Sequence, residues 1–124
     1  MRLLLDTHAL LWWLADEGLS ESARGLIADP DNQVAVSAAS AWEISIKKAL
    51  GKLAAPDDLE QQVAENGFDP LPITIAHGIA AGALPRHHED PFDRMLIAQA
   101  RAEGLTIVTR DSRFKAYDVA LLPA

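Results

Sequence analysis

Short runs of apolar residues alternate along this chain with longer segments in which apolar positions recur at helical spacing. Residues 3–5 form the first run and predict a buried strand, which is followed by a helix over residues 8–16. Residues 34–36 and 106–109 predict two further buried strands, and residues 119–122 a strand that closes the sheet. Because unbroken apolar runs are typical of strands covered on both faces, the pattern indicates a parallel sheet between helical layers.

The segments between these strands predict the remaining helices. Ser20 is placed to cap a helix that ends near residue 29, and Ser37 or Ser40 is placed to cap the helix that ends before Gly51. The apolar positions of that second helix recur at helical spacing, which predicts that they share one side: Ala39, Trp42, Ile46 and Leu50.

The middle of the chain is more polar and predicts surface elements. Residues 56–66 form a polar helix, residues 68–75 an edge strand or extended segment rich in proline, and residues 75–84 a helix of small residues. Asp90 and Pro91 then predict a capped helix that continues to Gly104. The fold class is therefore α/β, a three-layer α/β/α sandwich around a short, mainly parallel sheet.

Composition narrows the class of protein. A length of 124 residues with 49% hydrophobic residues suits one domain over residues 1–124. The net charge of −7 argues against binding nucleic acid by bulk electrostatics, so any nucleic-acid substrate would need local help. Bound divalent cations or a basic partner protein would offset the excess acid. Cysteine is absent, which excludes thiolate catalysis and fits a reducing compartment. The first apolar stretch is too short for a membrane span, so we expect a cytoplasmic protein without a membrane partner.

Four acidic residues stand where such a fold brings distant segments together: Asp6, Glu43, Asp93 and Asp111. Asp6 and Asp111 each follow a buried strand, and α/β sheets bind ligands beyond the carboxyl ends of their strands. Mg²⁺ and Mn²⁺ are hard cations that prefer oxygen ligands and retain open positions for water and phosphate. The four acids therefore predict a metal site.

Each acid also has a structural interpretation. Asp93 suits the first turn of a capped helix, and Asp111 suits a turn or the cap of a short helix. In isolation, Glu43 would be a solvated position beside the apolar side of its helix. Asp6 is the hardest to explain in this way, since a carboxylate at the end of a buried strand is costly to desolvate.

The segments LLLDTHALLWWL, SAASAWEISIKKALGKL, HHEDPFDRMLIAQA and LTIVTRD resemble the PIN-domain family, in particular the VapC-like toxins of bacterial toxin–antitoxin pairs. The resemblance spans essentially the whole chain, and DPFDRMLIAQA is its most specific member. It implies an Mg²⁺- or Mn²⁺-dependent endoribonuclease, usually a homodimer, held inactive by a cognate antitoxin that fills the active-site groove. Asp6, Glu43, Asp93 and Asp111 match the family's four acids in order, so the resemblance implies an active enzyme.

Neighbouring residues suggest supporting roles. Thr7 and Thr109 are placed to donate hydrogen bonds to the carboxylates, and Asp90 is either the helix cap or a further carboxylate of the site. Several cations near the acids are candidates for RNA binding, with solvated surface as the alternative: Lys47, Lys48, Lys52, Arg94, Arg110 and Arg113.

The histidines and tryptophans have weaker interpretations. A metal role for His8 is disfavoured because its side chain points away from Asp6 if the strand continues, and His87 and His88 are expected to be loop residues that contact RNA. Trp12 and Trp13 lie about 100° apart on one helix, so we expect unequal burial, with one of them available to a partner.

Two other classes of α/β protein fit the sequence poorly. A haloacid-dehalogenase-like phosphatase would need a second aspartate where His8 stands, and a receiver domain would need a lysine where Arg110 stands. No phosphate-binding glycine loop follows any strand. The alternative to the nuclease is a non-catalytic module on the same fold that binds RNA or protein. The RNA target, the antitoxin and the number of metal ions are not encoded in any local motif.

Overall fold

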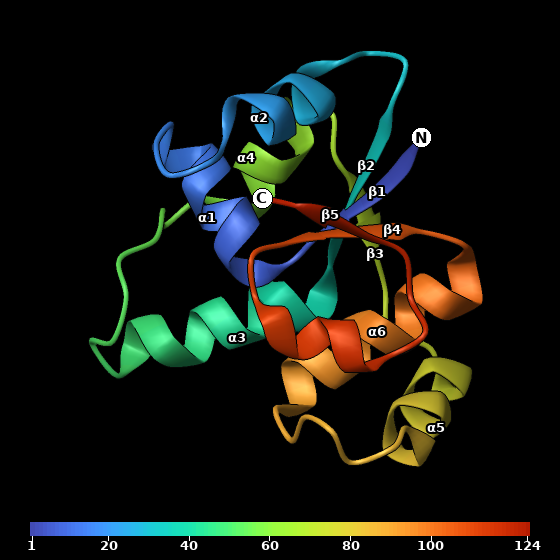
Figure 1. Cartoon of the computed structure of the whole chain (residues 1–124). Helices are drawn as coiled ribbons and strands as arrows, with labels where there is room; N and C mark the ends of the chain where they lie inside the picture. Colours follow the sequence, from blue (N-terminus) through green and yellow to red (C-terminus); the bar gives the residue numbers. More distant parts are fainter.

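Five parallel strands form the centre of the computed structural model, which describes all 124 residues (Figure 1). The strands are β1 (Arg2–Leu5), β2 (Gln33–Ser37), β3 (Asp69–Leu71), β4 (Thr106–Thr109) and β5 (Leu121–Pro123). Their order is β3-β2-β1-β4-β5, and every neighbouring pair is parallel. The predicted parallel sheet is thus confirmed. The last strand begins two residues later than expected because Val119 donates to the carbonyl of Tyr117 at 3.0 Å in a turn.

Seven helical segments connect these strands. They are α1 (Thr7–Ala15), α2 (Glu21–Ala28), α3 (Ala38–Ala49), α4 (Leu59–Glu65), α5 (Ile75–Ala83), α6 (Pro91–Glu103) and the 3₁₀ helix η1 (Ser112–Ala116). Ser37, and not Ser40, caps α3, and Asp90 caps α6 through the amides of Phe92 and Asp93. Gly104 ends α6 at φ 68°, a conformation that glycine adopts without steric cost. None of these helices is long and apolar enough to cross a lipid bilayer.

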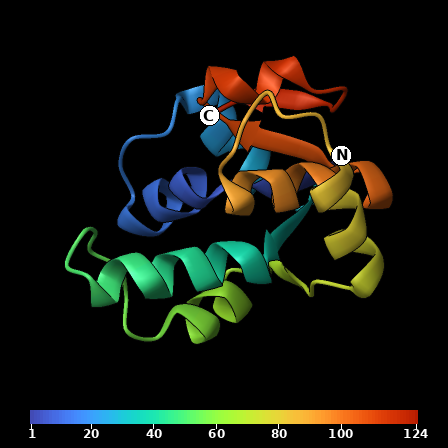
Figure 2. The same ribbon diagram turned by 90° about the horizontal axis from the view of Figure 1, so that it is seen from below.

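The strands alternate their side chains between two cores, as a period of two requires. Leu3, Leu5 and Val36 pack on one side with α1, α2 and α4, whereas Leu4 and Ile107 pack on the other side with α6 and η1. These helical groups lie on opposite faces of the sheet in Figures 1 and 2. The predicted three-layer α/β/α sandwich is confirmed.

Of the four apolar residues that helical spacing places on one side of α3, only Ala39 is buried. Trp42 is 62% exposed and Leu50 63% exposed, whereas Ser40 and Glu43 are buried. The helix starts against the sheet and then extends beyond it (Figure 2), so its second half has no sheet to pack on. The side of α3 that faces the protein at its first turns is therefore the one that carries Glu43.

Trp12 and Trp13 are both partly buried, each against a different neighbour. The Arg110 guanidinium lies 4.2 Å from the centroid of Trp12 and covers that ring. Trp13 packs against Phe68 and donates from Nε1 to Asn66 at 3.0 Å. Neither tryptophan is left fully exposed on α1.

Candidate metal centre

The carboxyl ends of β1 and β4 bring the first and last of the four acids together. Asp6 follows β1 directly and donates its amide to the carbonyl of Val108 in β4 at 3.1 Å, and Asp111 lies two residues beyond β4. The chain order of the sheet reverses on either side of β1, and ligands bind α/β sheets at such switch points. The two acids therefore stand at the position that the topology favours for a site.

Asp6 is almost fully buried, with 4% of the residue exposed. Its Oδ1 accepts from the amide of Ala9 at 2.8 Å, which caps α1, and its Oδ2 accepts from Thr109 Oγ1 at 2.6 Å. Burial raises the pKa of Asp6 even though both hydrogen bonds lower it, and the nearby charge of Asp111 raises it further. The carboxylate is held in one orientation and carries an uncompensated desolvation cost.

Glu43 is buried as deeply, with 3% exposed, so the interpretation as a solvated helix position is wrong. Thr7 Oγ1 donates to its Oε1 at 2.7 Å, and Lys47 Nζ donates to its Oε2 at 2.5 Å. Thr7 also contacts Ser40 Oγ at 3.2 Å. Thr7 and Thr109 thus each donate a hydroxyl hydrogen bond to an acid, which is the contact their positions suggested.

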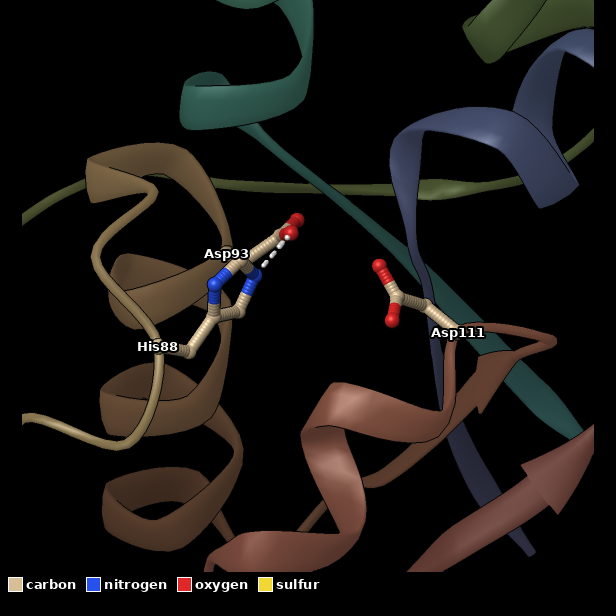
Figure 3. A group of neighbouring side chains, drawn as sticks. All are labelled: His88, Asp93 and Asp111. Atoms are coloured by element: carbon tan, nitrogen blue, oxygen red, sulfur yellow. Dashed lines mark hydrogen bonds and ion pairs between the residues drawn. The ribbon is translucent and has the colours of Figure 1, made fainter.

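Asp93 and Asp111 face each other across a short gap (Figure 3). One ligand atom from each of these carboxylates and from His88 lie within 4.8 Å of one another. Burial raises the pKa of Asp93 to about 6, with smaller contributions from the charges of Asp90 and Glu43. The Arg113 guanidinium, which donates to both oxygens of Asp111, lowers the pKa of that acid instead.

His88 lies in the loop between α5 and α6, as expected, but its contacts differ from the expected contact with RNA. It is 4% exposed, and its Nε2 lies 2.7 Å from Asp93 Oδ2. His87, its neighbour, is exposed and packs edge-on against Tyr117. The available signal was a histidine shortly before a capped helix that carries an acid in its first turn.

The candidate RNA-binding cations have different partners in the structure. Lys47 lies beside the acids, since it pairs with Glu43 and its pKa is raised mainly by that hydrogen bond. Lys48 pairs instead with the exposed Asp57. Contact of Arg94 or Arg110 with RNA is not supported, because both guanidiniums donate to backbone carbonyls of the protein. Arg110 follows Thr109 and points to the opposite side of the strand end, where it covers the α1 surface.

Arg94 is expected to contribute to stability rather than to ligand binding. Its guanidinium donates to the carbonyls of Ala81 and Leu84 at 2.9 Å and of His88 at 3.1 Å, and all three residues are buried. Replacing Arg94 with Met removes a donor from each carbonyl; Ala81 and His88 keep only longer contacts, at 3.4 Å from the Leu84 amide and 3.3 Å from Tyr117 Oη, and Leu84 keeps none. We therefore expect a loss of about 2–4 kcal/mol in the free energy of unfolding. Urea unfolding measures this, with the exposed Arg86→Met as control. Equal stability of the two variants would contradict the assignment.

The donor set fits a hard divalent cation. Asp6, Glu43, Asp93 and Asp111 offer only oxygen, and burial or mutual charge raises the pKa of Asp6 and Asp93. Two cations of the protein contact the cluster: Lys47 pairs with Glu43, and Arg113 pairs with Asp111. Clustered, desolvated carboxylates of this kind bind Mg²⁺ or Mn²⁺ in preference to soft metals.

Fold and site together define a parallel α/β protein with an acidic centre at the switch point of its sheet. The family model of the PIN domain matches residues 3–120. The chain also resembles Ribonuclease VapC22 of Mycobacterium tuberculosis (strain ATCC 25618 / H37Rv), with 34% identity over 119 residues that cover 92% of this chain and 90% of that protein. The chain therefore belongs to the PIN domain family.

One further relative resembles this chain in sequence, and two solved structures resemble it in fold. Ribonuclease VapC16 of the same organism is 38% identical over 68 residues, which cover 52% of this chain and 48% of that protein. A toxin–antitoxin complex from Klebsiella pneumoniae matches the fold with a TM-score of 0.70 at 22% identity, over 98% of each chain. VapBC2 from Rickettsia felis, bound to a DNA fragment from its promoter, matches the fold with a TM-score of 0.69 at 18% identity. The match covers 100% of this chain and 99% of that chain.

Proposed function

We propose that this chain is a metal-dependent endoribonuclease toxin that hydrolyses RNA phosphodiester bonds and is neutralised by a cognate antitoxin. The observation that carries the proposal is that Asp93 and Asp111 offer ligand oxygens within 4.8 Å of each other in a PIN-domain fold. Asp6 and Glu43 lie near enough for the charge of Asp111 to raise the pKa of Asp6 and for the charge of Glu43 to raise that of Asp93. The similarity to Ribonuclease VapC22 over nearly the whole chain supports RNA as the substrate. The proposed ion is Mg²⁺ or Mn²⁺.

The four acids have distinct tasks in this proposal. Asp93 and Asp111, whose carboxylates face each other, hold the ion, and Asp6 and Glu43 complete the oxygen donors of the site. A bound divalent ion supplies charge stabilisation for the phosphodiester and lowers the pKa of the attacking water. Thr7 and Thr109 fix the orientation of Glu43 and Asp6 through their hydroxyls.

Two cations beside the acids are proposed to contact the RNA backbone. Lys47 pairs with Glu43 and Arg113 with Asp111, and the Arg113 side chain is largely exposed. Side chains of this kind contact phosphate oxygens and hold the RNA backbone in register, without reading its sequence. They also offset the net charge of −7 at the point where RNA has to approach.

Exposed apolar surfaces on α3 and α5, and a groove beside α3, support the proposed protein partners. Trp42 and Leu50 on α3 and Ile75 and Ile79 on α5 are large apolar side chains with exposures of 62%, 63%, 85% and 71%. A groove of about 750 Å³ also runs between α3, α4 and β3 and is lined mainly by apolar residues. Surfaces of this kind mark protein interfaces, and they support an antitoxin and a second copy of the chain as partners. Light scattering tests the homodimer, since the monomer mass is 13.4 kDa.

The test of the proposed activity is RNA cleavage by the purified, antitoxin-free chain. Total cellular RNA and DNA of matched length are incubated with Mg²⁺, with Mn²⁺ and with chelator. We expect cuts in RNA alone that stop with chelator and return with excess metal. If the folded chain binds RNA but leaves it intact with every metal, the non-catalytic binding module replaces the nuclease.

A further inference from the structure

His88 lies in the segment between α5 and α6, and side chains from two other elements fix its backbone. Tyr117 Oη accepts from the amide of His88 at 2.9 Å and donates to the carbonyl of Pro85 at 2.7 Å. Arg94 Nη1 donates to the carbonyls of the same two residues, at 3.1 Å for His88 and 3.0 Å for Pro85. Both backbone polar groups of His88 are therefore bonded to side chains from other segments, which leaves the residue little freedom to move.

The imidazole of His88 is fixed as well. Its ring packs at 68° against Phe114, a fully buried residue of η1, with 6.2 Å between the ring centroids. Its Nε2 is 2.7 Å from Asp93 Oδ2. An ionised carboxylate only accepts hydrogen bonds, so Nε2 carries the proton in this contact. Figure 3 shows the ring reaching Asp93 from one side while Asp111 faces the same carboxylate from the other.

We infer that His88 is a positioning residue of the proposed metal centre: it holds Asp93 Oδ2 and thereby turns Oδ1 toward Asp111. The inference rests on the proposed function, because it assigns the orientation of a proposed metal ligand. Residues that hydrogen-bond metal ligands fix their geometry and set the affinity for the ion. Here α6 alone does not fix the carboxylate of Asp93, since Asp90 bonds the backbone amide of Asp93 and not its side chain.

The alternative is that the imidazole binds the ion directly. In the observed contact the proton on Nε2 points at Asp93 and occupies the nitrogen that a metal would need. The geometry thus favours the role of donor over that of ligand. The two roles also differ in what replaces histidine, since an amide group at the same reach can donate a hydrogen bond but is a poor substitute for an imidazole ligand.

The experiment compares His88→Gln with His88→Asn, which differ by one methylene. The Gln amide reaches about as far as Nε2 of histidine, whereas the Asn amide stops short of Asp93 Oδ2. Free Mn²⁺ is measured by electron paramagnetic resonance during titration of each protein. We expect Mn²⁺ affinity to fall roughly 10–100-fold in His88→Asn and to stay within a few-fold of the natural chain in His88→Gln. Circular dichroism and urea unfolding establish that both variants are folded.

Three results would overturn the positioning role. Equal affinity in all three proteins removes any role for the hydrogen bond. An equal, large loss in both variants for Mn²⁺ but not for Mg²⁺ assigns the imidazole as a direct ligand. Absence of Mn²⁺ binding by the natural chain, with no difference from Asp93→Asn, removes the metal centre itself, so failure of the proposed function is distinguished from failure of this inference.

Discussion

Replacing Asp93 with Asn is expected to lower RNA cleavage by at least roughly 1000-fold while leaving the fold intact. The substitution removes the charge of a proposed metal ligand, and losses of several kcal/mol in transition-state stabilisation correspond to this factor. The side chain keeps its size, and its amide oxygen still accepts from His88 Nε2, which lies 2.7 Å from the present carboxylate. Single-turnover cleavage of a fixed RNA, at saturating Mn²⁺, measures the effect.

Asp93→Asn is also expected to stabilise the metal-free protein, which separates a loss of catalysis from a loss of folding. Burial holds the pKa of Asp93 near 6, so the ionised carboxylate destabilises the metal-free protein at neutral pH. Asn removes this cost, so we expect the metal-free variant to unfold at a higher urea concentration than the natural chain. The matched control is Asp118→Asn, an exposed acid for which cleavage and stability should stay unchanged. Retained cleavage in Asp93→Asn would remove this acid from the site.

The arrangement of the strands followed from the sequence because each apolar run is bounded by residues that end a strand. Asp6 interrupts the first run and Asp111 follows the last long one, and parallel strands share their carboxyl edge. Asp90 and Pro91 mark the start of α6 in the same local way. Local patterns therefore predicted which acids would lie near one another, without any knowledge of the contacts between them.

The features that sequence did not predict depend on contacts between distant segments. Helical spacing aligns Trp42 and Leu50 with Ala39, but it does not show how far along α3 this side stays buried. Ala39 is buried, whereas Trp42 and Leu50 are exposed. His88 is buried because Tyr117 and Arg94 hold its backbone from other segments. Arg94 and Arg110 adjoin acids in the chain, but their guanidiniums turn to backbone carbonyls. Proximity in sequence is a poor guide to the partner of a long cation.

The stability of the metal-free protein is expected to fall as pH rises from 5 to 7.5. The pKa of Asp93 is raised in the folded state to about 6 from an ordinary value of 3.8, so folded protein holds this proton more tightly than unfolded protein. The resulting stabilisation is complete below about pH 4 and is lost as pH rises through about 6. Asp111 has a lowered pKa, so its contribution is already complete at pH 5 and does not change across this window.

Bound metal is expected to reverse that trend, because Mn²⁺ and Mg²⁺ bind the ionised carboxylates and compete with protons. From Asp93 we expect the metal-free chain to lose about 1.4 kcal/mol between pH 5 and 7.5. With saturating Mn²⁺ its stability should instead be greater at pH 7.5 than at pH 5. Urea unfolding at both pH values, with and without chelator, measures the two slopes. Asp93→Asn should reduce both slopes, because it removes one of the groups for which proton and metal compete, while Asp6, whose pKa burial also raises, keeps a smaller slope. A slope equal to that of the natural chain would place the competition elsewhere.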